Sequence, residues 1–382
     1  MANYDYEIVN GRKIRVRPKE TVSEIDKNGY FRRQPNHFTT PFGDGENDLK
    51  AEGNKRYRLV WAKLCHWSNR AAIVRELEGL EDQISVNMVE HAPHEKNLGW
   101  EYVYNENNID PVLGDQFLSE AYYRADDDYQ GRTTVPALID TATGKVVNND
   151  YNWLTTYFEV NFRPWHKKGA PELYPVELRE EIDKMNLWLF DNINNAVYRS
   201  SFSRSNEGHF DGVNTFYAAM DRLEKRLETN RFLFGDYVTD SDIRLYVTLA
   251  RLDIRYTAQL GETKRPLYNY KNLWGYAKEL WEIPAFAHHT DFAAIIRQGR
   301  IEGEEDGFRA STHYDLALPK IDWDAQWKVS TERACLSSDP THPIYLGNNR
   351  RFDIDPTWYD LGAESPKKEE KETPPSCGCC CG

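Results

Sequence analysis

The chain has 382 residues, of which 40% are hydrophobic, and its formal net charge is −13. This length allows two domains with buried cores. The negative net charge, and the lack of a dense stripe of Lys and Arg, argue against a protein that binds nucleic-acid phosphates. No stretch approaches the ~20 apolar residues of a membrane span, and residues 1–19 contain no apolar run of signal-peptide length, so we expect a cytoplasmic protein.

The N-terminal part alternates strands and helices. Residues 1–50 are polar and rich in turn formers, which predicts an extended arm. The alternation of Tyr57, Leu59 and Trp61 with their neighbours predicts a strand, and a helix follows over 71–77. We expect a second strand over 84–89, a long Asn-rich connection over 90–115, a helix over 117–125, a hairpin over 133–147 and a helix over 152–158. This order is that of an α/β thioredoxin-like domain, which we assign to residues 51–160.

The remainder predicts helices alone. Apolar residues spaced by three and four form one stripe from Leu178 to Val197 and another from Val213 to Leu227. Thr239 and Asp242 have the spacing of a capping box at the start of an apolar helix. We assign residues 161–325 to an all-α domain. Residues 326–382 form a C-terminal extension, whose Lys-, Glu- and Pro-rich end is expected to be disordered.

A thioredoxin-like half joined to an all-helical half is the glutathione-transferase plan. The chain resembles the glutathionyl-hydroquinone reductases, the xi class of glutathione transferases, from about residue 30 to about residue 295. Residues 65–68, Cys-His-Trp-Ser, stand where that family has Cys-Pro-Trp-Ala. Further matches are Gly99-Trp100, the stretch 131–136 (Gly-Arg-Thr-Thr-Val-Pro), the stretch 194–198 (Asn-Asn-Ala-Val-Tyr), 251–256 and 270–276.

Cys65 is the candidate nucleophile. A cysteine at the junction of a strand and the following helix faces the positive end of the helix dipole, which stabilises a thiolate. Ser68 stands three residues further on, so the site has no second cysteine with which to close its own disulfide. A mixed disulfide on Cys65 must then be resolved by an outside thiol. The alternative is a small buried cysteine at the end of a strand.

The resemblance also implies a site for the thiol cosubstrate, which is glutathione or another low-molecular-weight thiol. Trp100 and Arg132 would bind the glycine end and backbone of the tripeptide. Val135 and Pro136 would form a cis peptide that exposes the Val135 backbone to the cysteinyl residue, although an ordinary strand-edge proline is the alternative. Where the family has Glu-Ser for the γ-glutamyl group, this chain has Asp150-Tyr151, so the identity of the thiol stays open.

Two tyrosines match residues that the family places over its active site. A phenol there can donate a hydrogen bond to a quinol oxygen or transfer a proton to a ring carbon, and the resemblance implies this role for Tyr198 and Tyr256. The alternative is an interior tyrosine with a satisfied hydroxyl. The family has a third active-site tyrosine, but residues 295–300 contain none, and nothing justifies substituting Tyr314.

Three functions follow from these residues. The first is an enzyme that reduces glutathionyl-hydroquinone-type conjugates through a mixed disulfide on Cys65. The second is a deglutathionylase acting on other mixed disulfides, and the third is a non-catalytic binding module with the same fold. The resemblance further implies a homodimer, and we expect no bound metal.

The cysteines are unevenly placed. Cys65 and Cys335 stand alone, and four lie at the C-terminal end, at positions 377, 379, 380 and 381. A disulfide framework would spread its cysteines over the fold, so this placement favours an intracellular protein. The four clustered thiols are open to three interpretations: an accessory metal or redox role, lipidation, or a dispensable tail.

Overall fold

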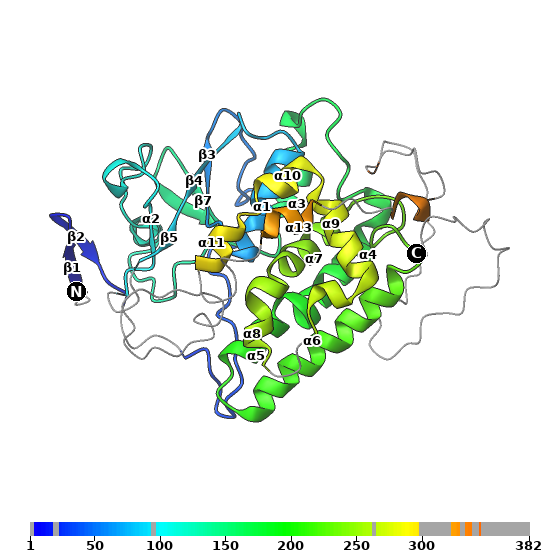
Figure 1. Cartoon of the computed structure of the whole chain (residues 1–382). Helices are drawn as coiled ribbons and strands as arrows, with labels where there is room; N and C mark the ends of the chain where they lie inside the picture. The colour runs from blue at the N-terminus through cyan, green and yellow to red at the C-terminus, as the bar shows by residue number, and fades with distance from the viewer. Residues whose placement is uncertain are drawn as a thin grey trace. The chain divides into compact units, whose positions relative to one another are not determined.

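A computed structural model of the chain describes residues 4–17, 23–92, 97–261, 265–297, 322–328, 333–337 and 344. The chain divides into two compact units (Figure 1). The first contains the described residues of Met1–Ala170 and His288–Pro319, and the second those of Pro171–Ala287 and Lys320–Gly382. The clustered cysteines at positions 377–381 and Tyr314 lie outside the described residues. No helix in the described ranges combines the length and apolarity needed to cross a membrane.

The first unit is built on a four-stranded mixed sheet with the order β4-β3-β7-β8. The central strand β3 pairs parallel with β4 and antiparallel with β7, and β7 continues into β8 as a hairpin. All five residues of β3 are buried, and since their side chains point alternately to the two faces, β3 is covered on both faces. This is the thioredoxin-like arrangement expected from the sequence. The strands are β3 (Tyr57–Trp61), β4 (Ile84–Met88), β7 (Ala137–Asp140) and β8 (Lys145–Asn148).

Helices accompany this sheet at the positions that the sequence predicts. Helix α1 packs against α3, and α2 packs against β8. The segment after residue 287 also belongs to this unit, which the sequence pattern did not indicate: Asn69 on α1 donates a hydrogen bond to the carbonyl oxygen of His289 (2.6 Å). The helices are α1 (His66–Leu77), α2 (Leu118–Ala125), α3 (Leu154–Val160), the 3-10 turn η3 (Arg163–Trp165) and α11 (Phe292–Arg297).

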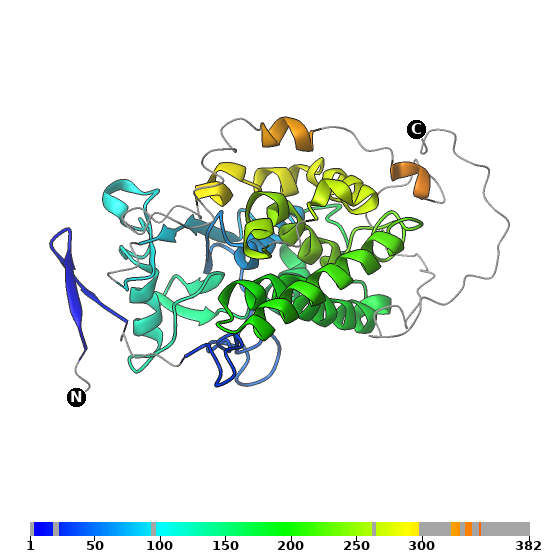
Figure 2. The ribbon, with the colours of Figure 1, turned by 60° about the horizontal axis from the view of Figure 1, so that its bottom comes forward.

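The first fifty residues contain more structure than an extended arm. Strands β1 (Tyr6–Val9) and β2 (Arg12–Arg15) form an antiparallel hairpin, the dark blue pair in Figure 2. Arg12 on this hairpin forms an ion pair with Glu120 on α2 (2.9 Å). Further along, single bridges join Ile25 to Phe31 and Phe42 to Leu49. The arm therefore has internal pairing of its own, and its hairpin is joined to α2 by an ion pair.

The long connection between β4 and α2 also has structure of its own. It contains the short paired strands β5 (Glu90–His91) and β6 (Trp100–Glu101) and the 3-10 turn η2 (Glu106–Asn108). Ala92, Leu98 and Phe117 from this region pack with Ile14 of β2 in a small apolar cluster. The connection and the hairpin are thus joined by buried apolar surface.

The second unit is helical, as the sequence predicts. Its α7 begins with the expected capping box: Thr239 is the N-cap residue, and the Asp242 carboxylate accepts the Thr239 N–H (2.8 Å). One expectation is corrected, because the apolar stripe from Leu178 to Val197 is not one continuous helix. A π-helical segment, η5, interrupts it. The elements are η4 (Val176–Leu178), α4 (Arg179–Leu189), η5 (Phe190–Asn194), α5 (Ala196–Phe202), α6 (Asn206–Arg226), α7 (Asp240–Arg251), η6 (Leu252–Tyr256), α8 (Thr257–Gln259), η7 (Leu267–Asn269), α9 (Lys271–Trp281), α10 (Pro284–His288), α13 (Trp323–Trp327) and η9 (Arg333–Leu336).

Asp253→Asn is expected to stabilise the second unit, and more so at alkaline pH. The Asp253 carboxyl lies in the π-helical segment η6 and accepts hydrogen bonds from the backbone N–H groups of Leu267 and Tyr268. Burial raises the pKa of this carboxyl from 3.8 to about 6, and the two hydrogen bonds oppose the shift only in part. With a raised folded-state pKa, the contribution of the group to stability is complete below the unfolded value and is lost as the pH rises through about 6.

The measurement is urea unfolding of both proteins at pH 5 and pH 8. Asparagine keeps an acceptor oxygen but never ionises, so its stabilising effect should grow by about 1 kcal/mol between the two pH values. Asp221→Asn is the control, because Asp221 on α6 is 61% exposed and its ion pair with Arg265 contributes little. An Asp253→Asn effect that is the same at both pH values would contradict the prediction.

Candidate active site

Cys65 is the N-cap residue of α1, where the chain leaves β3 and turns into the helix. Its backbone is extended (φ −87°, ψ 115°), and its carbonyl oxygen accepts the Asn69 N–H (3.0 Å) as the first helical hydrogen bond. The thiol is free and buried, makes no capping hydrogen bond, and has no acidic residue beside it in the first turn of the helix. The thiol therefore stands at the N-terminal end of a helix whose first turn carries no carboxylate.

Ser68 stabilises the turn that carries Cys65. Its hydroxyl oxygen accepts the Ala62 N–H (3.1 Å) and lies 3.2 Å from the Ala62 carbonyl oxygen and 3.3 Å from that of Cys65. His66 and Trp67 are also buried, and their ring centroids are 4.2 Å apart. The three residues after Cys65 thus pack and bond within the fold, and none of them supplies a second thiol.

The Val135-Pro136 peptide bond is cis, as predicted. The Cys65 sulfur lies 3.7 Å from the Val135 carbonyl oxygen, so the structure brings these two sequence-predicted residues together. The preceding residue is held by Tyr122, whose hydroxyl donates to the Thr134 carbonyl oxygen (2.8 Å) and accepts the Thr134 N–H (3.2 Å). The loop beside the thiol is therefore fixed by hydrogen bonds from α2.

Trp100 and Arg132 lie at the same loop. The Trp100 indole N–H donates to the Thr133 carbonyl oxygen (3.0 Å), and its ring stacks on His91 with centroids 3.7 Å apart. The Arg132 guanidinium forms an ion pair with Glu24 (2.8 Å), and its side chain is 40% exposed. Trp100 is thus buried and already bonded, whereas Arg132 retains exposed surface for a ligand.

Asp150 and Tyr151 are joined to the first turns of α1. Arg70 on α1 donates to the Tyr151 carbonyl oxygen (2.7 Å), and the Tyr151 and Trp67 ring centroids are 4.7 Å apart. The Asp150 carboxylate is buried and accepts a hydrogen bond from the Asn36 amide (2.9 Å). Burial raises the pKa of Tyr151, so its hydroxyl stays protonated at neutral pH. This pair therefore offers one acid and one phenol close to the helix that carries Cys65.

The structure adds residues of the N-terminal arm that the sequence analysis missed. Glu24 contacts Arg132, and Asn36 contacts Asp150. Gln34 accepts the Arg132 N–H (2.8 Å), and the Arg33 guanidinium lies 4.6 Å from the centroid of the Trp67 ring. These arm residues follow no helix or strand period, so the pattern gave no signal for them beyond the start of the family resemblance near residue 30.

Tyr198 and Tyr256 lie together in the second unit. Their ring centroids are 6.3 Å apart, and a side-chain hydrogen bond joins them. Tyr256 ends the π-helical segment η6, and Tyr198 follows η5 by four residues, so both lie next to π-helical turns, which are frequent at functional sites. Burial, and then the neighbouring Tyr198, raise the pKa of Tyr256 well above its ordinary value. The Tyr256 phenol therefore stays protonated at neutral pH.

These two tyrosines belong to one unit and Cys65 to the other, so a site shared by all three stays a prediction. Helix α11 carries no tyrosine at the position of the family's third. The described ranges also contain no group of three or more His, Cys, Asp or Glu side chains placed to hold a metal ion.

Comparison with known proteins gives a consistent match. Residues 197–279 match the family model of the glutathione S-transferase C-terminal domain. The chain is 34% identical to glutathione S-transferase omega-like 2 of Schizosaccharomyces pombe, over 70% of this chain and 88% of that protein. It is 33% identical to the glutathionyl-hydroquinone reductase YqjG of Escherichia coli, over 63% of this chain and 73% of that protein. Among solved structures, the xi glutathione S-transferase of Phanerochaete chrysosporium has a TM-score of 0.65 at 33% identity, covering 71% of this chain and 88% of that one.

Proposed function

Because the chain belongs to the xi-class glutathione transferases, the family of the glutathionyl-hydroquinone reductases, we propose that it is a glutathione-dependent reductase with Cys65 as its nucleophile. One observation carries the role of Cys65. Its free thiol stands at the N-terminus of α1, 3.7 Å from the carbonyl oxygen of the residue before the cis proline. A thiol at a helix N-terminus is favoured as the nucleophilic thiolate.

The reaction proceeds in two steps. In the first, the Cys65 thiolate attacks the glutathionyl sulfur of an aromatic thioether, so that an S–S bond forms and the carbon–sulfur bond breaks. The ring carbon takes the electron pair and a proton, which Tyr256 or Tyr198 donates. In the second, the thiolate of another glutathione attacks the mixed disulfide and restores Cys65. The aromatic compound is reduced by two electrons, and its glutathionyl group leaves with one free glutathione as a single disulfide.

The cosubstrate in this proposal is held by residues of the first unit. Arg132 receives the glycine carboxylate, the backbone of Val135 pairs with the cysteinyl residue, and Asp150 with Tyr151 receives the γ-glutamyl end. Trp100 supports this site through its hydrogen bond to Thr133. The homodimer and the cytoplasmic location expected from the sequence stay predictions.

A deglutathionylase is the second candidate. It uses the same thiolate on disulfide substrates, whose cleavage needs no proton on carbon. The observation in its favour is the absence of a tyrosine on α11, which removes one aromatic donor from the quinol side of the family's site.

Tyr256→Phe is the variant that separates the two. We expect kcat on a glutathionyl-hydroquinone thioether to fall about 10- to 100-fold, because the phenol that protonates carbon is lost. On the mixed disulfide of glutathione with 2-mercaptoethanol, kcat should change less than about twofold, because a thiolate leaves there without protonation of carbon.

The matched control is Tyr270→Phe. Tyr270 is buried, and its neighbour is Arg265, whose guanidinium carbon lies 3.7 Å from the centroid of the Tyr270 ring. Neither residue belongs to the proposed site, so loss of the hydroxyl should leave both activities unchanged. A wild-type protein active on the disulfide alone would favour the deglutathionylase. Equal losses on both substrates in Tyr256→Phe would mean that this tyrosine is structural.

A further inference from the structure

The cation proposed to receive the glycine end of the thiol already faces a carboxylate of the chain itself. Glu24 Oε1 lies 2.8 Å from a terminal nitrogen of Arg132. The contact uses one nitrogen of the guanidinium, and Arg132 Nε is buried without a hydrogen-bond partner among the described residues. The ion pair therefore has one nitrogen–oxygen contact, whereas the stronger bidentate form of an arginine–carboxylate pair has two.

A second cation lies near this ion pair. Arg17, at the end of the hairpin segment, is close enough to Arg132 for mutual repulsion and close enough to Glu24 for attraction. The Arg17 Nε atom is likewise buried without a partner among the described residues. The Glu24 carboxylate thus contacts the Arg132 guanidinium and attracts that of Arg17, so removing its charge would leave both cations without this counter-charge.

The arm holds Glu24 in this position. The same Oε1 atom accepts the Gln34 N–H (2.7 Å), and the Glu24 carbonyl oxygen accepts the Arg32 N–H (2.6 Å). The adjacent residue Ile25 pairs with Phe31, which is 5% exposed and anchors the turn. Glu24 is therefore preorganised at Arg132, and a ligand must compete with a carboxylate that is already in place.

We propose that Glu24 is a specificity-determining residue, which weakens the binding of thiols that carry a free carboxylate at the glycine end. The proposal rests on the proposed function, because it takes Arg132 as the glycine-end cation. A ligand carboxylate must displace Glu24 from Arg132 or approach it against like charge. A thiol whose glycine end is uncharged meets neither obstacle.

The experiment compares two unreactive probes, S-methylglutathione and its glycine ethyl ester, by isothermal titration calorimetry on the full chain. Glu24→Gln should tighten binding of S-methylglutathione about three- to tenfold, because the competing charge is gone while an amide oxygen still accepts the Gln34 N–H. Binding of the ester should stay unchanged. The ratio of the two affinities therefore reports the charge at Glu24 and is insensitive to a general loosening of the arm.

Asp26→Asn is the matched control, because Asp26 lies in the same arm and forms an ion pair with Arg32 (3.0 Å) away from Arg132. It should alter neither affinity. If neither probe binds the wild type, the proposed function fails, and this inference with it. If both probes bind but Glu24→Gln leaves their ratio unchanged, or weakens S-methylglutathione, the inference about Glu24 alone is overturned.

Discussion

Replacing Cys65 with alanine is expected to lower turnover at least about a thousandfold on every glutathionyl substrate. Both steps of the proposed reaction use the sulfur: it attacks the substrate, and it carries glutathione as a mixed disulfide. The neighbouring Ser68 cannot replace it, because its hydroxyl is bonded to the Ala62 backbone and remains a weak nucleophile. The fold should be unaffected, since alanine is also accommodated in a buried position before a helix.

The loss should be specific to this thiol. Ending the chain at Pro375 removes the four clustered cysteines and is expected to keep full activity with excess glutathione, because the outside thiol resolves the mixed disulfide. Mass spectrometry of the wild type treated with oxidised glutathione should find the adduct on Cys65. Substantial turnover by Cys65→Ala, with its circular-dichroism spectrum unchanged, would exclude the mechanism and favour a binding module.

The elements that the sequence predicted well are those whose signal is local. The Thr239 and Asp242 spacing located the start of α7, because a capping box is formed within four residues. The alternation around Leu59 located β3. The apolar stripe ending at Val197 wrongly suggested one continuous helix. A π-helical segment adds one residue to a turn while the apolar side chains stay on the buried face, so the spacing of apolar residues alone does not reveal it.

The residues of the candidate site also differ in whether their signal in the sequence is local. Cys65, Val135 and Asp150 could be proposed from the sequence because each lies in or beside a short motif with a recognisable neighbour. Glu24 and Asn36 were missed because their partners, Arg132 and Asp150, are more than one hundred residues away in the chain. A contact over that separation leaves no period in a single sequence.

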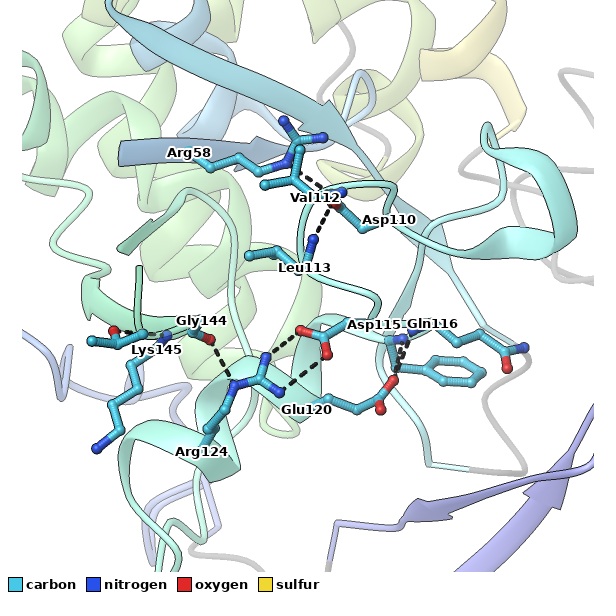
Figure 3. A network of polar contacts seen from close by, with 12 residues as sticks. Arg58, Asp110, Val112, Leu113, Asp115, Gln116, Glu120, Arg124, Gly144 and Lys145 are labelled. Atoms are coloured by element: carbon cyan, nitrogen blue, oxygen red, sulfur yellow. Dashed lines mark hydrogen bonds and ion pairs between the residues drawn. The ribbon is translucent and has the colours of Figure 1, made fainter. Parts of the chain in front are cut away.

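Arg58 shows that a long-range partner is equally hidden from the sequence pattern inside the core. It stands in the alternating β3 pattern between Tyr57 and Leu59, and its charged side chain is only 7% exposed. Its partner is Asp110, from the long Asn-rich connection, with the carboxylate 2.8 Å from Arg58 Nε and fully buried (Figure 3). The same carboxylate accepts the Asn87 amide (2.6 Å) and the backbone N–H groups of Val112 and Leu113. A buried strand accepts this arginine because its charge is neutralised and hydrogen-bonded.

A second ion pair holds the end of the connection. Arg124 on α2 forms a two-pronged pair with Asp115 and also donates to the Gly144 carbonyl oxygen (3.0 Å), as Figure 3 shows. The Tyr102 N–H bonds to the Gln116 carbonyl oxygen (3.1 Å), which closes the loop that begins after β6. Because β6 carries Trp100, this network helps to hold Trp100 in place at the proposed thiol site.

Asp110→Asn is therefore expected to lower the free energy of unfolding by about 3 kcal/mol, because it leaves the Arg58 charge buried without a counter-charge. It also turns an amide N–H group toward Arg58 and Asn87, which are themselves donors. The double variant Arg58→Met with Asp110→Asn should recover most of the loss, because no buried charge remains and the amide oxygen still accepts the Val112 and Leu113 N–H groups. Urea unfolding of the four proteins of this cycle measures the coupling directly.

The control is Asp291→Asn, which breaks an ion pair with Lys63 whose two side chains are 30% and 29% exposed and should cost less than about 1 kcal/mol. Because the network positions the segment that follows Trp100, Asp110→Asn should also raise KM for glutathione, and the double variant should restore it along with the stability. A single variant as stable as the wild type would mean that water or a shifted backbone satisfies Arg58. In that case β3 would tolerate a buried arginine without its partner, and the connection would owe its position to the apolar cluster around Phe117 instead.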